Sequence, residues 1–599
     1  MWKEGYIVRL ALVALTMAAA FVFLANHLFT LQVGRHEELL TKARQKYTES
    51  KSSLGARGRV YDIHGNLLAG NLACQDIFAE PKWVYKLGKE EADRVLRVFS
   101  QELDVPLDLL RQRFKRGRVE VVLKRDAELD RAVKLKRWIQ AYNEAAAEKN
   151  APKLRRVRFV ETQKRYYPKG SLAANTLGFL NEQGQGGAGI EQLMNQRLIP
   201  GEGEAMFERD PRGRRLRNDS EQVRHPSNGW NVYLTIDETI QSIVEEELAG
   251  LYEEQEPKAA FAVMANPKTG AVMAMAQLPT FNPNHRGGIT RRQWENQILT
   301  YSFEPGSVMK GLSLAGALHY NVVNLGSTYY CEKGLWYHAG RRLRDSGHQY
   351  ENLQVWEIVQ KSSNIGTAKI AMDMGPARLY TTLHNFGFGQ TTDLGFPGEA
   401  AGIFRPLSRW DGLSLSRFAI GQGIAVTPLQ IVQGYCALAN DGVMMQMRLI
   451  DRMEDPASGL VEFYPPKAKH RVVSAAAARQ MITAMKTVTK EGGTATRAAV
   501  DGFEVAGKTG TAQKFVNQTY DNGLYVASFI GIAPADDPAF VLYVVADEPG
   551  GRSHYGGTVA GPTFSRIAER TLRYLQVAPS TPGDSIVLDR VIADAGGDE

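Results

Sequence analysis

The hydrophobic pattern of the chain begins with a long apolar run. Leu10–Ala25 contains no charged residue, and the mostly apolar stretch continues to Val33. About 20 such residues in a helix cross the hydrocarbon core of a bilayer. No small-residue cleavage site closes the run, which favours an uncleaved signal anchor over a secreted signal peptide. We therefore expect residues 1–9 to lie in the cytoplasm and residues 10–33 to span the inner (cytoplasmic) membrane once.

The pattern after this run is mixed and strongly charged. Residues 35–56 predict a polar helical stalk, Glu90–Leu103 and Leu107–Phe114 have helical periodicity, and Val119–Leu123 is strand-like. We identify no nucleophile paired with a base in this part of the chain. We interpret residues 34–226 as a non-catalytic pedestal of mixed α/β structure.

From about residue 227 the apolar runs become longer and more regular. The expected elements are a strand, a helix, a hairpin, two further strands and a final helix: Asn231–Asp237, Thr239–Leu251, Phe261–Ala276, Ala527–Ala533, Ala539–Ala546 and Phe564–Leu575. Asn282–Trp294 is expected to be a surface loop. These elements predict an α+β domain over residues 227–576, built on an antiparallel sheet with helices packed on it. Residues 577–599 are rich in Pro, Gly, Ser and Asp and predict a disordered tail.

Composition narrows the classes of function. The 599 residues carry 72 basic and 65 acidic side chains, a net charge of +7, with both signs interspersed. We predict no nucleic-acid binding, while attraction to anionic lipid or an anionic wall is compatible with this charge. Cys74, Cys331 and Cys436 lack metal-ligand spacing, and we interpret them as buried free thiols, with a Cys331–Cys436 disulfide left open. No metal or cofactor is expected.

Phe303–Lys310 carries the first candidate chemistry. A Pro-Gly turn runs into a predicted helix, Ser307–Tyr320, so Ser307 lies at the helix N-terminus. Lys310 follows three residues later on the same face. A serine beside a lysine is a nucleophile beside a base if burial or a nearby cation keeps the lysine neutral. A Ser-x-x-Lys sequence by itself often occurs by chance on the surface of a helix.

Two further motifs follow in order. Ser362-Ser363-Asn364 is expected in a loop at a helix end, because residues two apart do not share a helix face. Lys508-Thr509-Gly510-Thr511 follows a strand-like run. S-x-x-K, S-x-N and K-T-G in this order are the signature of penicillin-binding proteins and class A β-lactamases. An earlier K-T-G, Lys268–Gly270, falls at a hairpin tip, and we expect Lys268 to be a solvated charge.

Three other stretches carry a resemblance to class B penicillin-binding proteins, most closely the division-specific FtsI type. Arg57–Ala69 resembles the R-G-x-I-x-D-R-x-G-x-x-L-A segment of that family, and Gly184–Gly201 resembles its G-x-x-G-I-E…L-x-G element. Phe418–Gln430 resembles the block G-Q-G-x-x-V-T-P-L-Q, where we expect Thr427 to cap a helix whose first residue is Pro428. The resemblance covers most of residues 57–575. It implies a β-lactamase-like transpeptidase fold.

The resemblance also implies roles for the motif residues. Ser307 would attack the penultimate D-Ala carbonyl of a peptidoglycan stem peptide, and Lys310 would accept its proton. Ser362 would relay a proton to the leaving amine, and Asn364 would bind the substrate amide. A cationic Lys508 would keep Lys310 neutral by repulsion. The substrate-binding residues would be the rest of the last motif: Thr509, Gly510 and Thr511.

The implied function is cross-linking of stem peptides during septal cell-wall synthesis, with inhibition by β-lactams. The implied partners are a membrane-embedded FtsW-type glycan polymerase and other divisome proteins, with the catalytic domain periplasmic. Alternatives are an elongation-type class B transpeptidase, a β-lactamase or D,D-carboxypeptidase with the same motifs, a penicillin-sensing receptor and a catalytically idle scaffold. A receptor would need several membrane spans, and the sequence predicts one.

Overall fold

The computed structural model describes residues 2–117, 119–208, 223–224, 226–516, 520 and 523–579. It divides into two compact units: residues 1–57 with 199–229, and residues 58–198 with 230–599. The predicted disordered tail, 577–599, falls almost wholly outside the described residues.

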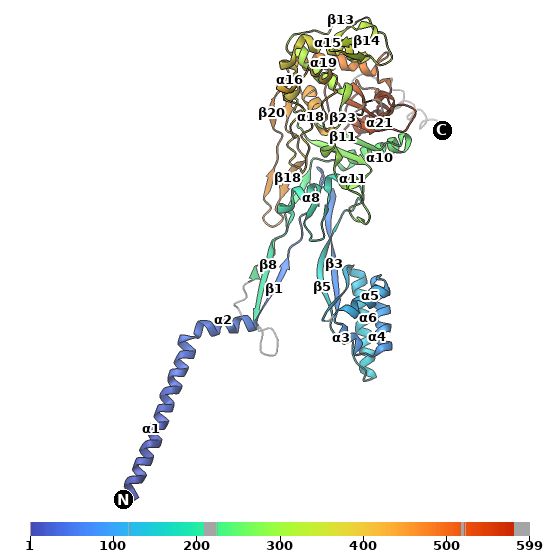
Figure 1. Ribbon diagram of the computed structural model, residues 1–599. Coiled ribbons are helices and arrows are strands. Elements are labelled where there is room, and N and C mark those ends of the chain that lie inside the picture. The colour runs from blue at the N-terminus through green and yellow to red at the C-terminus, as the bar shows by residue number, and fades with distance from the viewer. Residues whose placement is uncertain are drawn as a thin grey trace, which may run out of the picture. The chain divides into compact units, whose positions relative to one another are not determined.

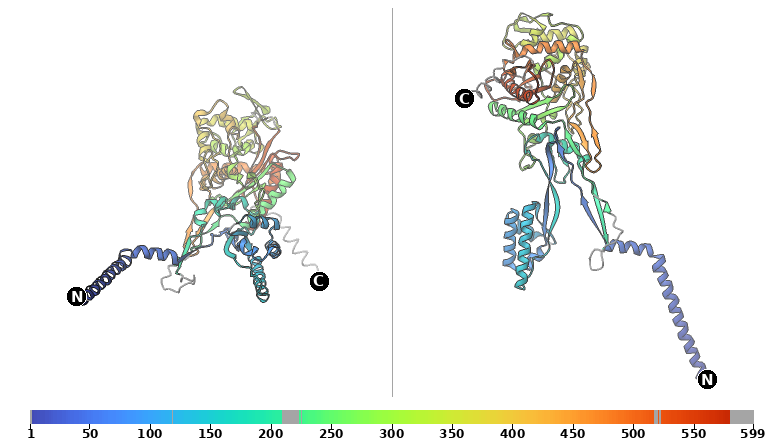
Figure 2. Two further views of the ribbon diagram at one scale, coloured as in Figure 1. Left: turned by 60° about the horizontal axis from the view of Figure 1, so that its bottom comes forward. Right: turned by 180° about the vertical axis from the view of Figure 1, so that it is seen from behind.

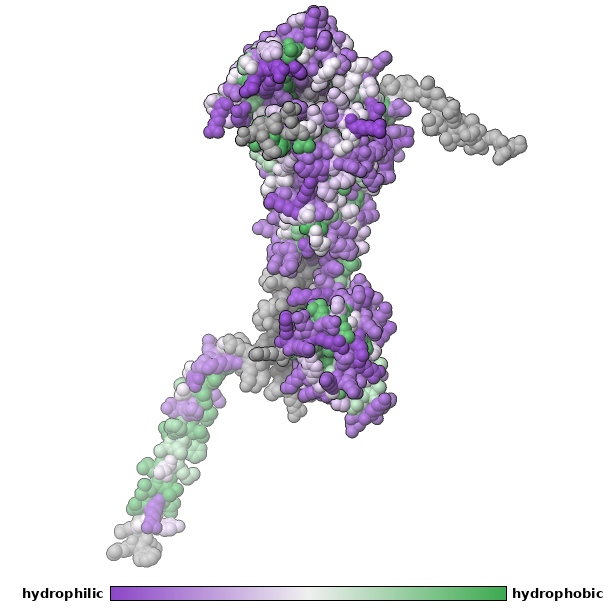
Figure 3. Space-filling view, turned by 45° about the vertical axis from the view of Figure 1, so that its right-hand side comes forward, coloured by the Kyte–Doolittle hydropathy of each residue, from purple (hydrophilic) through white to green (hydrophobic). Residues whose placement is uncertain are grey.

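The first unit contains the apolar run. Helix α1 spans Trp2–Phe29, followed by a short π-helical turn, Thr30–Gly34, and by helix α2, His36–Tyr47. Gly5–Gly34 is long and apolar enough to cross a membrane, and Figure 3 shows hydrophobic residues covering much of this helix. The length and composition agree with the predicted anchor.

The predicted helical stalk was only partly right. Residues 36–47 are helical, but Thr48–Leu54 forms strand β1, which pairs antiparallel with β8, Glu202–Glu208, and β8 pairs with β9, Val223–Arg224. The run Thr-Glu-Ser-Lys-Ser-Ser-Leu has low helix propensity, because Ser and Thr side chains compete for backbone hydrogen bonds. A pairing partner more than 140 residues away in sequence decides the conformation, and local periodicity does not reveal it.

The second unit begins with a sheet and a helical cluster. Strand β3, Leu67–Ala79, pairs with β2, β4 and β5, and is visible beside β5 as a long ribbon in Figure 2. The other elements are β2 (Val60–Tyr61), α3 (Pro81–Tyr85), α4 (Lys89–Leu103), α5 (Leu107–Arg116), β4 (Val121–Glu128), α6 (Leu129–Glu148) and β5 (Val157–Tyr166). Phe99, Leu110 and Phe114 are in their buried core. The predicted helices are confirmed, and the predicted strand begins two residues later.

Short elements connect this cluster to the larger core. They are α7 (Ala174–Leu177), β6 (Phe179–Leu180), β7 (Gly186–Ala188), α8 (Gly189–Leu193) and α9 (Asn195–Leu198). Strand β10, Asn231–Leu234, lies parallel to β2 and antiparallel to β18, Ile450–Glu454, which pairs with β19, Val461–Phe463. One sheet therefore contains strands from both halves of the sequence.

A five-stranded antiparallel sheet forms the centre of the second unit, in the order β12-β11-β23-β22-β21. Its strands are β11 (Ala259–Ala265), β12 (Val272–Leu278), β21 (Ala506–Gln513), β22 (Tyr525–Ala533) and β23 (Phe540–Asp547). Every residue of β11 and β23 is buried, which explains their continuous apolar runs. The predicted hairpin and strand pair are confirmed.

Helices cover both faces of this sheet. Helix α10, Glu238–Gln255, and helix α21, Gly561–Tyr574, pack on each other and on the sheet, and Figure 1 shows them beside β11 and β23. In a second group of helices, α18 (Pro428–Ala439) and α19 (Ala475–Lys486) contact the sheet, and α13 (Met309–His319) packs on both of them. The α+β prediction is confirmed.

The remaining elements surround the second group of helices. They are α11 (Arg291–Trp294), α12 (Gln297–Thr300), α14 (Val355–Lys361), α15 (Asn364–Met374), α16 (Pro376–Asn385), α17 (Ser414–Phe418) and α20 (Gly556–Val559), with the strand pairs β13–β16 (Thr328–Tyr330, Asn352–Gln354), β14–β15 (Leu335–His338, Arg341–Arg344) and β17–β20 (Val443–Met445, Ala468–Arg471). The predicted loop Asn282–Trp294 ends in α11, which has a Thr290 capping box.

Candidate active site

The turn that carries Ser307 is held between two other segments. Gly306 has φ +57°, and its N–H donates to the Gly421 carbonyl at 3.1 Å. A Cβ on Gly306 would lie 3.0 Å from Ala512 of β21. Glycine is therefore required both by the backbone conformation and by the closeness of β21. Ser307 is half-buried in a 3₁₀ turn, and the α-helix begins at Met309, two residues after the predicted start.

Lys310 is completely buried on the first turn of α13. Its Nζ donates to the Ser362 carbonyl at 2.6 Å and lies 3.2 Å from Ser362 Oγ. The first and second motifs are therefore in direct contact.

The second motif lies between two helices, as predicted. Ser362 has φ +59° and ends α14, while Ser363 caps α15 by accepting from the Gly366 N–H at 3.0 Å. Asn364 is the first residue of α15, and its Nδ2 donates to the Arg344 carbonyl at 2.7 Å. The turn places Ser362 just after α14 and Asn364 at the first position of α15.

Lys508 brings in the third motif. It is completely buried on β21, and its Nζ lies 2.9 Å from Ser362 Oγ and 3.4 Å from Thr509 Oγ1. One serine hydroxyl therefore contacts both lysines. The structure brings together the three motifs that the sequence separates widely.

Burial controls the charge of this lysine pair. Loss of hydration lowers the pKa of Lys310 to about 7, and the nearby Asp345 carboxylate partly opposes this. Burial, and then repulsion from Lys310, lowers the pKa of Lys508 well below its usual value. Burial therefore favours the neutral form of both lysines. Sequence analysis offered burial or a nearby cation such as Lys508 as the cause of a neutral Lys310. In the structure, burial is the cause that lowers the Lys310 pKa.

Asp345 is a site residue that the sequence did not reveal. Its buried carboxylate accepts from the Asn364 N–H at 2.5 Å, from the Ile365 N–H at 3.1 Å and from Ser363 Oγ at 2.8 Å. An acid at a helix N-terminus is stabilised by the free N–H groups there. Because Asp345 comes from the preceding hairpin, no local capping pattern identifies it.

The rest of the third motif packs closely against the Ser307 turn. A Cβ on Gly510 would clash with Ser528 Oγ and lie 3.1 Å from Val308 Cγ1. Thr509 Oγ1 is 2.9 Å from Thr494 Oγ1, and Thr511 Oγ1 accepts from the Gly556 N–H at 3.2 Å. These bonds fix the two threonine side chains.

Other candidates from the sequence fall outside this cluster. Lys268 lies at the predicted hairpin turn and pairs with Asp537 at 2.5 Å. Cys74, Cys331 and Cys436 are buried free thiols, so the disulfide left open from the sequence does not form. Within the described part of the chain no cluster of His, Cys, Asp and Glu has the arrangement of a metal site.

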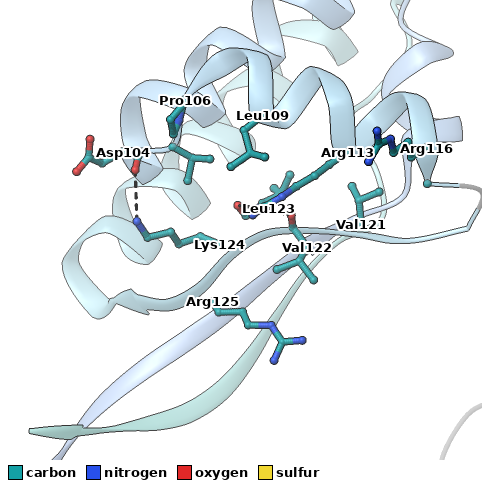
Figure 4. Close-up of a pocket in the computed structure, with 12 residues that line it drawn as sticks. Asp104, Pro106, Leu109, Arg113, Arg116, Val121, Val122, Leu123, Lys124 and Arg125 are labelled. Atoms are coloured by element: carbon teal, nitrogen blue, oxygen red, sulfur yellow. Dashed lines mark hydrogen bonds between the residues drawn. The ribbon is translucent and has the colours of Figure 1, made fainter. Parts of the chain in front are cut away.

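A hollow of about 720 Å³ lies far from the motifs in sequence, against α5 and β4 (Figure 4). Its lining includes Leu109, Arg113 and Leu123, and Lys124 Nζ donates to the Asp104 carbonyl across it at 3.3 Å. None of the motif residues lines it, so it is not the candidate active site.

Half-buried Ser307 precedes buried Lys310 by three residues, and Ser362 Oγ joins Lys310 to Lys508, an arrangement suited to serine-type acyl transfer. The model of the penicillin-binding protein transpeptidase domain matches residues 260–569, and that of the penicillin-binding protein dimerisation domain matches residues 52–234. The chain therefore belongs to the class B penicillin-binding proteins and is a transpeptidase.

Similar proteins agree with this assignment. A probable peptidoglycan D,D-transpeptidase PenA from Neisseria gonorrhoeae is 33% identical over 576 residues, 96% of this chain and 94% of that protein. The peptidoglycan D,D-transpeptidase FtsI of Escherichia coli K12 is 30% identical over 582 residues, with 96% and 94% covered. The crystal structure of penicillin-binding protein 3 from Mycobacterium tuberculosis, complexed with aztreonam, has a TM-score of 0.67 and 26% identity, covering 89% of this chain and 99% of that one.

Proposed function

We propose that this chain cross-links peptidoglycan stem peptides through a serine acyl-enzyme on Ser307. The observation that carries the proposal is the contact of Ser362 Oγ with both buried lysines, Lys310 and Lys508. A hydroxyl in this position moves protons between a base and a leaving group. Relatives named peptidoglycan D,D-transpeptidase support the choice of substrate.

The proposed reaction has two steps, acylation of Ser307 and transfer of the acyl group to an amine. Neutral Lys310 accepts the Ser307 proton as Ser307 Oγ bonds to the penultimate D-Ala carbonyl carbon. The bond to the terminal D-Ala nitrogen then breaks, and the proton on Lys310 passes through the Ser362 hydroxyl to that amine as D-Ala leaves, which makes Lys310 neutral again. An amine of a second stem peptide attacks the ester by the reverse route, which forms the cross-link and restores Ser307.

We propose that the substrate carboxylate determines which of the two lysines, Lys310 or Lys508, is protonated. In the free protein Asp345 raises the pKa of Lys310 and so favours its protonation. A substrate carboxylate beside Lys508, Thr509 and Thr511 would raise the pKa of Lys508 and draw the proton to it. Binding the correct substrate would thereby leave Lys310 neutral and able to act as the base.

Backbone and amide groups complete the proposed substrate contacts. The N–H groups of Ser307 and Thr511 would stabilise the tetrahedral oxyanion, and each such donor is worth about 3 kcal/mol in other enzymes. Asn364 would bind the substrate amide after exchanging its bond to the Arg344 carbonyl. Gly510 would allow the substrate backbone to lie close to β21.

We assign the cross-linking to septum formation rather than to elongation. The similarity to FtsI supports this subtype. Residues 227–576 would be the periplasmic catalytic domain, residues 34–226 its pedestal, and residues 10–33 the single anchor. The proposed partners are an FtsW-type glycan polymerase and other divisome proteins, and β-lactams would acylate the same serine.

Labelling with a fluorescent penicillin tests the mechanism. Full-length protein in detergent should form a long-lived adduct of one penicillin per chain by intact mass, and Ser307→Ala should form none. Rapid loss of the label would identify a hydrolase instead. A folded protein that takes no label would overturn the acyl-enzyme proposal and favour a scaffold.

A further inference from the structure

The β14–β15 hairpin, residues 335–344, has two unlike faces. Cross-strand partners in an antiparallel pair point to the same side. Leu335 is opposite Arg344 and Tyr337 is opposite Arg342, which defines one face. We call these four residues the outer face. The alternate pairs, Trp336 with Leu343 and His338 with Arg341, define the inner face.

The inner face fixes the hairpin to the catalytic region. Leu343 is buried in a small core with Ile365 and Ala368 of α15, and Trp336 packs against the same core. Lys369 lies 5.6 Å above the Trp336 ring. Because α15 begins at Asn364, the hairpin is packed on the helix that presents the second motif (Figure 1).

The outer face is left exposed. Tyr337 is 65% exposed and Leu335 38%, and Arg342 and Arg344 are also exposed. Tyrosine and arginine side chains are enriched at binding surfaces relative to the rest of a protein surface. The main chain here is fixed, since Arg417 donates to the Arg342 carbonyl at 2.9 Å.

The two outer-face arginines carry uncompensated charge. Other charged side chains near the hairpin form ion pairs: Lys369 with Glu332 at 2.6 Å and Lys333 with Glu351 at 3.1 Å. Asp345 is occupied by the α15 N-terminus. In the described part of the chain no carboxylate forms an ion pair with the guanidinium of Arg342 or Arg344. Two free guanidinium groups on one face favour a ligand with carboxylates, which arginine binds through two parallel hydrogen bonds.

The outer face is continuous with the second motif. The Arg344 carbonyl accepts from Asn364 Nδ2 at 2.7 Å, and Asp345, the next residue, holds the Asn364 N–H. A peptidoglycan strand whose D-Ala-D-Ala end lies at Asn364 would therefore have the rest of that stem peptide within reach of the hairpin. The donor's terminal carboxylate is assigned to Lys508 on β21 and is not available for this contact.

We propose that the outer face of the β14–β15 hairpin is a second substrate subsite that binds the free carboxylates of a peptidoglycan strand outside its D-Ala-D-Ala end. This inference rests on the proposed function for the identity of the strand. Leu335 and Tyr337 supply apolar contact to the stem peptide, and Arg342 and Arg344 pair with its carboxylates. The subsite selects strands by charge before the reaction at Ser307.

Binding of uncross-linked glycan strands with intact stem peptides tests the subsite. The full-length protein in detergent is compared with Arg342→Glu and Arg344→Glu, each on free-carboxylate strands and on the same strands after chemical amidation. Each substitution should weaken binding of free-carboxylate strands about three- to tenfold, in the range for exposed ion pairs and their reversal. Amidated strands should bind all proteins equally within twofold.

Arg341→Glu is the matched control. It makes the same charge change in the same hairpin, but Arg341 lies opposite His338 on the inner-face register. It should leave strand binding within twofold. Equal weakening by Arg341→Glu, or an equal effect on amidated strands, would overturn the subsite, as would wild-type binding by both outer-face variants.

Penicillin labelling separates the two proposals. It is performed on every variant, together with thermal unfolding, to check the fold and the three motifs. Absence of label on the folded wild type would overturn the acyl-enzyme proposal, while the strand-binding comparison would still decide the subsite. A labelled enzyme whose strand binding ignores carboxylates would overturn the subsite alone.

Discussion

Lys508 Nζ lies 2.9 Å from the hydroxyl oxygen of Ser362, which is 146 positions earlier in the chain. The same oxygen is 3.2 Å from Lys310 Nζ. Because both lysines are completely buried, neither can lose or gain a proton through bulk water without a relay. We propose that the Ser362 hydroxyl, which contacts both amines, is that relay and couples the protonation of one lysine to the other.

The first prediction concerns the pH dependence of acylation. Only neutral Lys310 accepts the Ser307 proton, and its pKa is lowered to about 7. Below that pH the lysine is charged, so the second-order rate of acylation by penicillin should rise about tenfold per pH unit and level off above the pKa. Stopped-flow labelling measures this profile. A flat rate between about pH 5 and about pH 9 would exclude Lys310 as the base.

The second prediction assigns part of that pKa to Asp345. Its negative charge raises the pKa of Lys310, so Asp345→Asn should lower that pKa and move the rising limb of the profile to lower pH. An asparagine Oδ1 still accepts an N–H bond from the start of α15, which limits the structural damage. Glu351→Gln removes an exposed carboxylate from the segment that follows the β14–β15 hairpin, and it should leave the pH profile unchanged. An unshifted profile in Asp345→Asn would contradict the assignment.

The sequence predicted the parts of the site that depend on local rules. Thr427 caps α18 with Pro428 at its first position, as the Thr-Pro pair indicates. Ser362 and Ser363 lie between α14 and α15 and Asn364 begins α15, in agreement with the rule that residues two apart do not share one helix face. The apolar runs of β11 and β23 predicted a buried central sheet.

Contacts between distant segments were not predictable in this way. Asp345 holds the start of α15 from a separate hairpin, and nothing in its neighbourhood in sequence marks it. Thr48–Leu54 became a strand because Glu202–Glu208 pairs with it. The low Lys310 pKa comes from complete burial, which depends on packing of several helices rather than on the motif itself.

The third prediction concerns the approach of β21 to the Ser307 turn. Gly510→Ala would place a Cβ in a clash with Ser528 Oγ and against Val308. Relief of that overlap must displace β21 or the turn, at a cost of about 1–3 kcal/mol in the free energy of unfolding. Since Lys508 is on the same strand, penicillin acylation should fall at least about tenfold, because small displacements of reacting groups are costly.

Gly250→Ala is the control for this substitution. Gly250 lies within α10, and a Cβ there would meet nothing within 4 Å. Alanine should stabilise the helix by about 0.5–1 kcal/mol and leave acylation unchanged. Unfolding midpoints and labelling rates of both variants are compared. Normal labelling of Gly510→Ala would show that the third motif tolerates displacement.

The last prediction concerns a buried ion pair in the second unit. Arg165 Nε lies 2.6 Å from Glu191 Oε1, with the two side chains 5% and 1% exposed, and Arg165 also donates to the Gly58 carbonyl at 2.8 Å. Arg165→Met removes this cation, while the buried Glu191 carboxylate keeps its hydrogen bond from the Tyr167 hydroxyl, so the free energy of unfolding should fall by about 3 kcal/mol. Arg291→Met breaks the exposed pair with Glu295 and should leave the free energy of unfolding almost unchanged, because solvent screens exposed ion pairs. Urea unfolding of the full-length variants measures both, and equal losses would show that burial does not set the strength of the Arg165 contact.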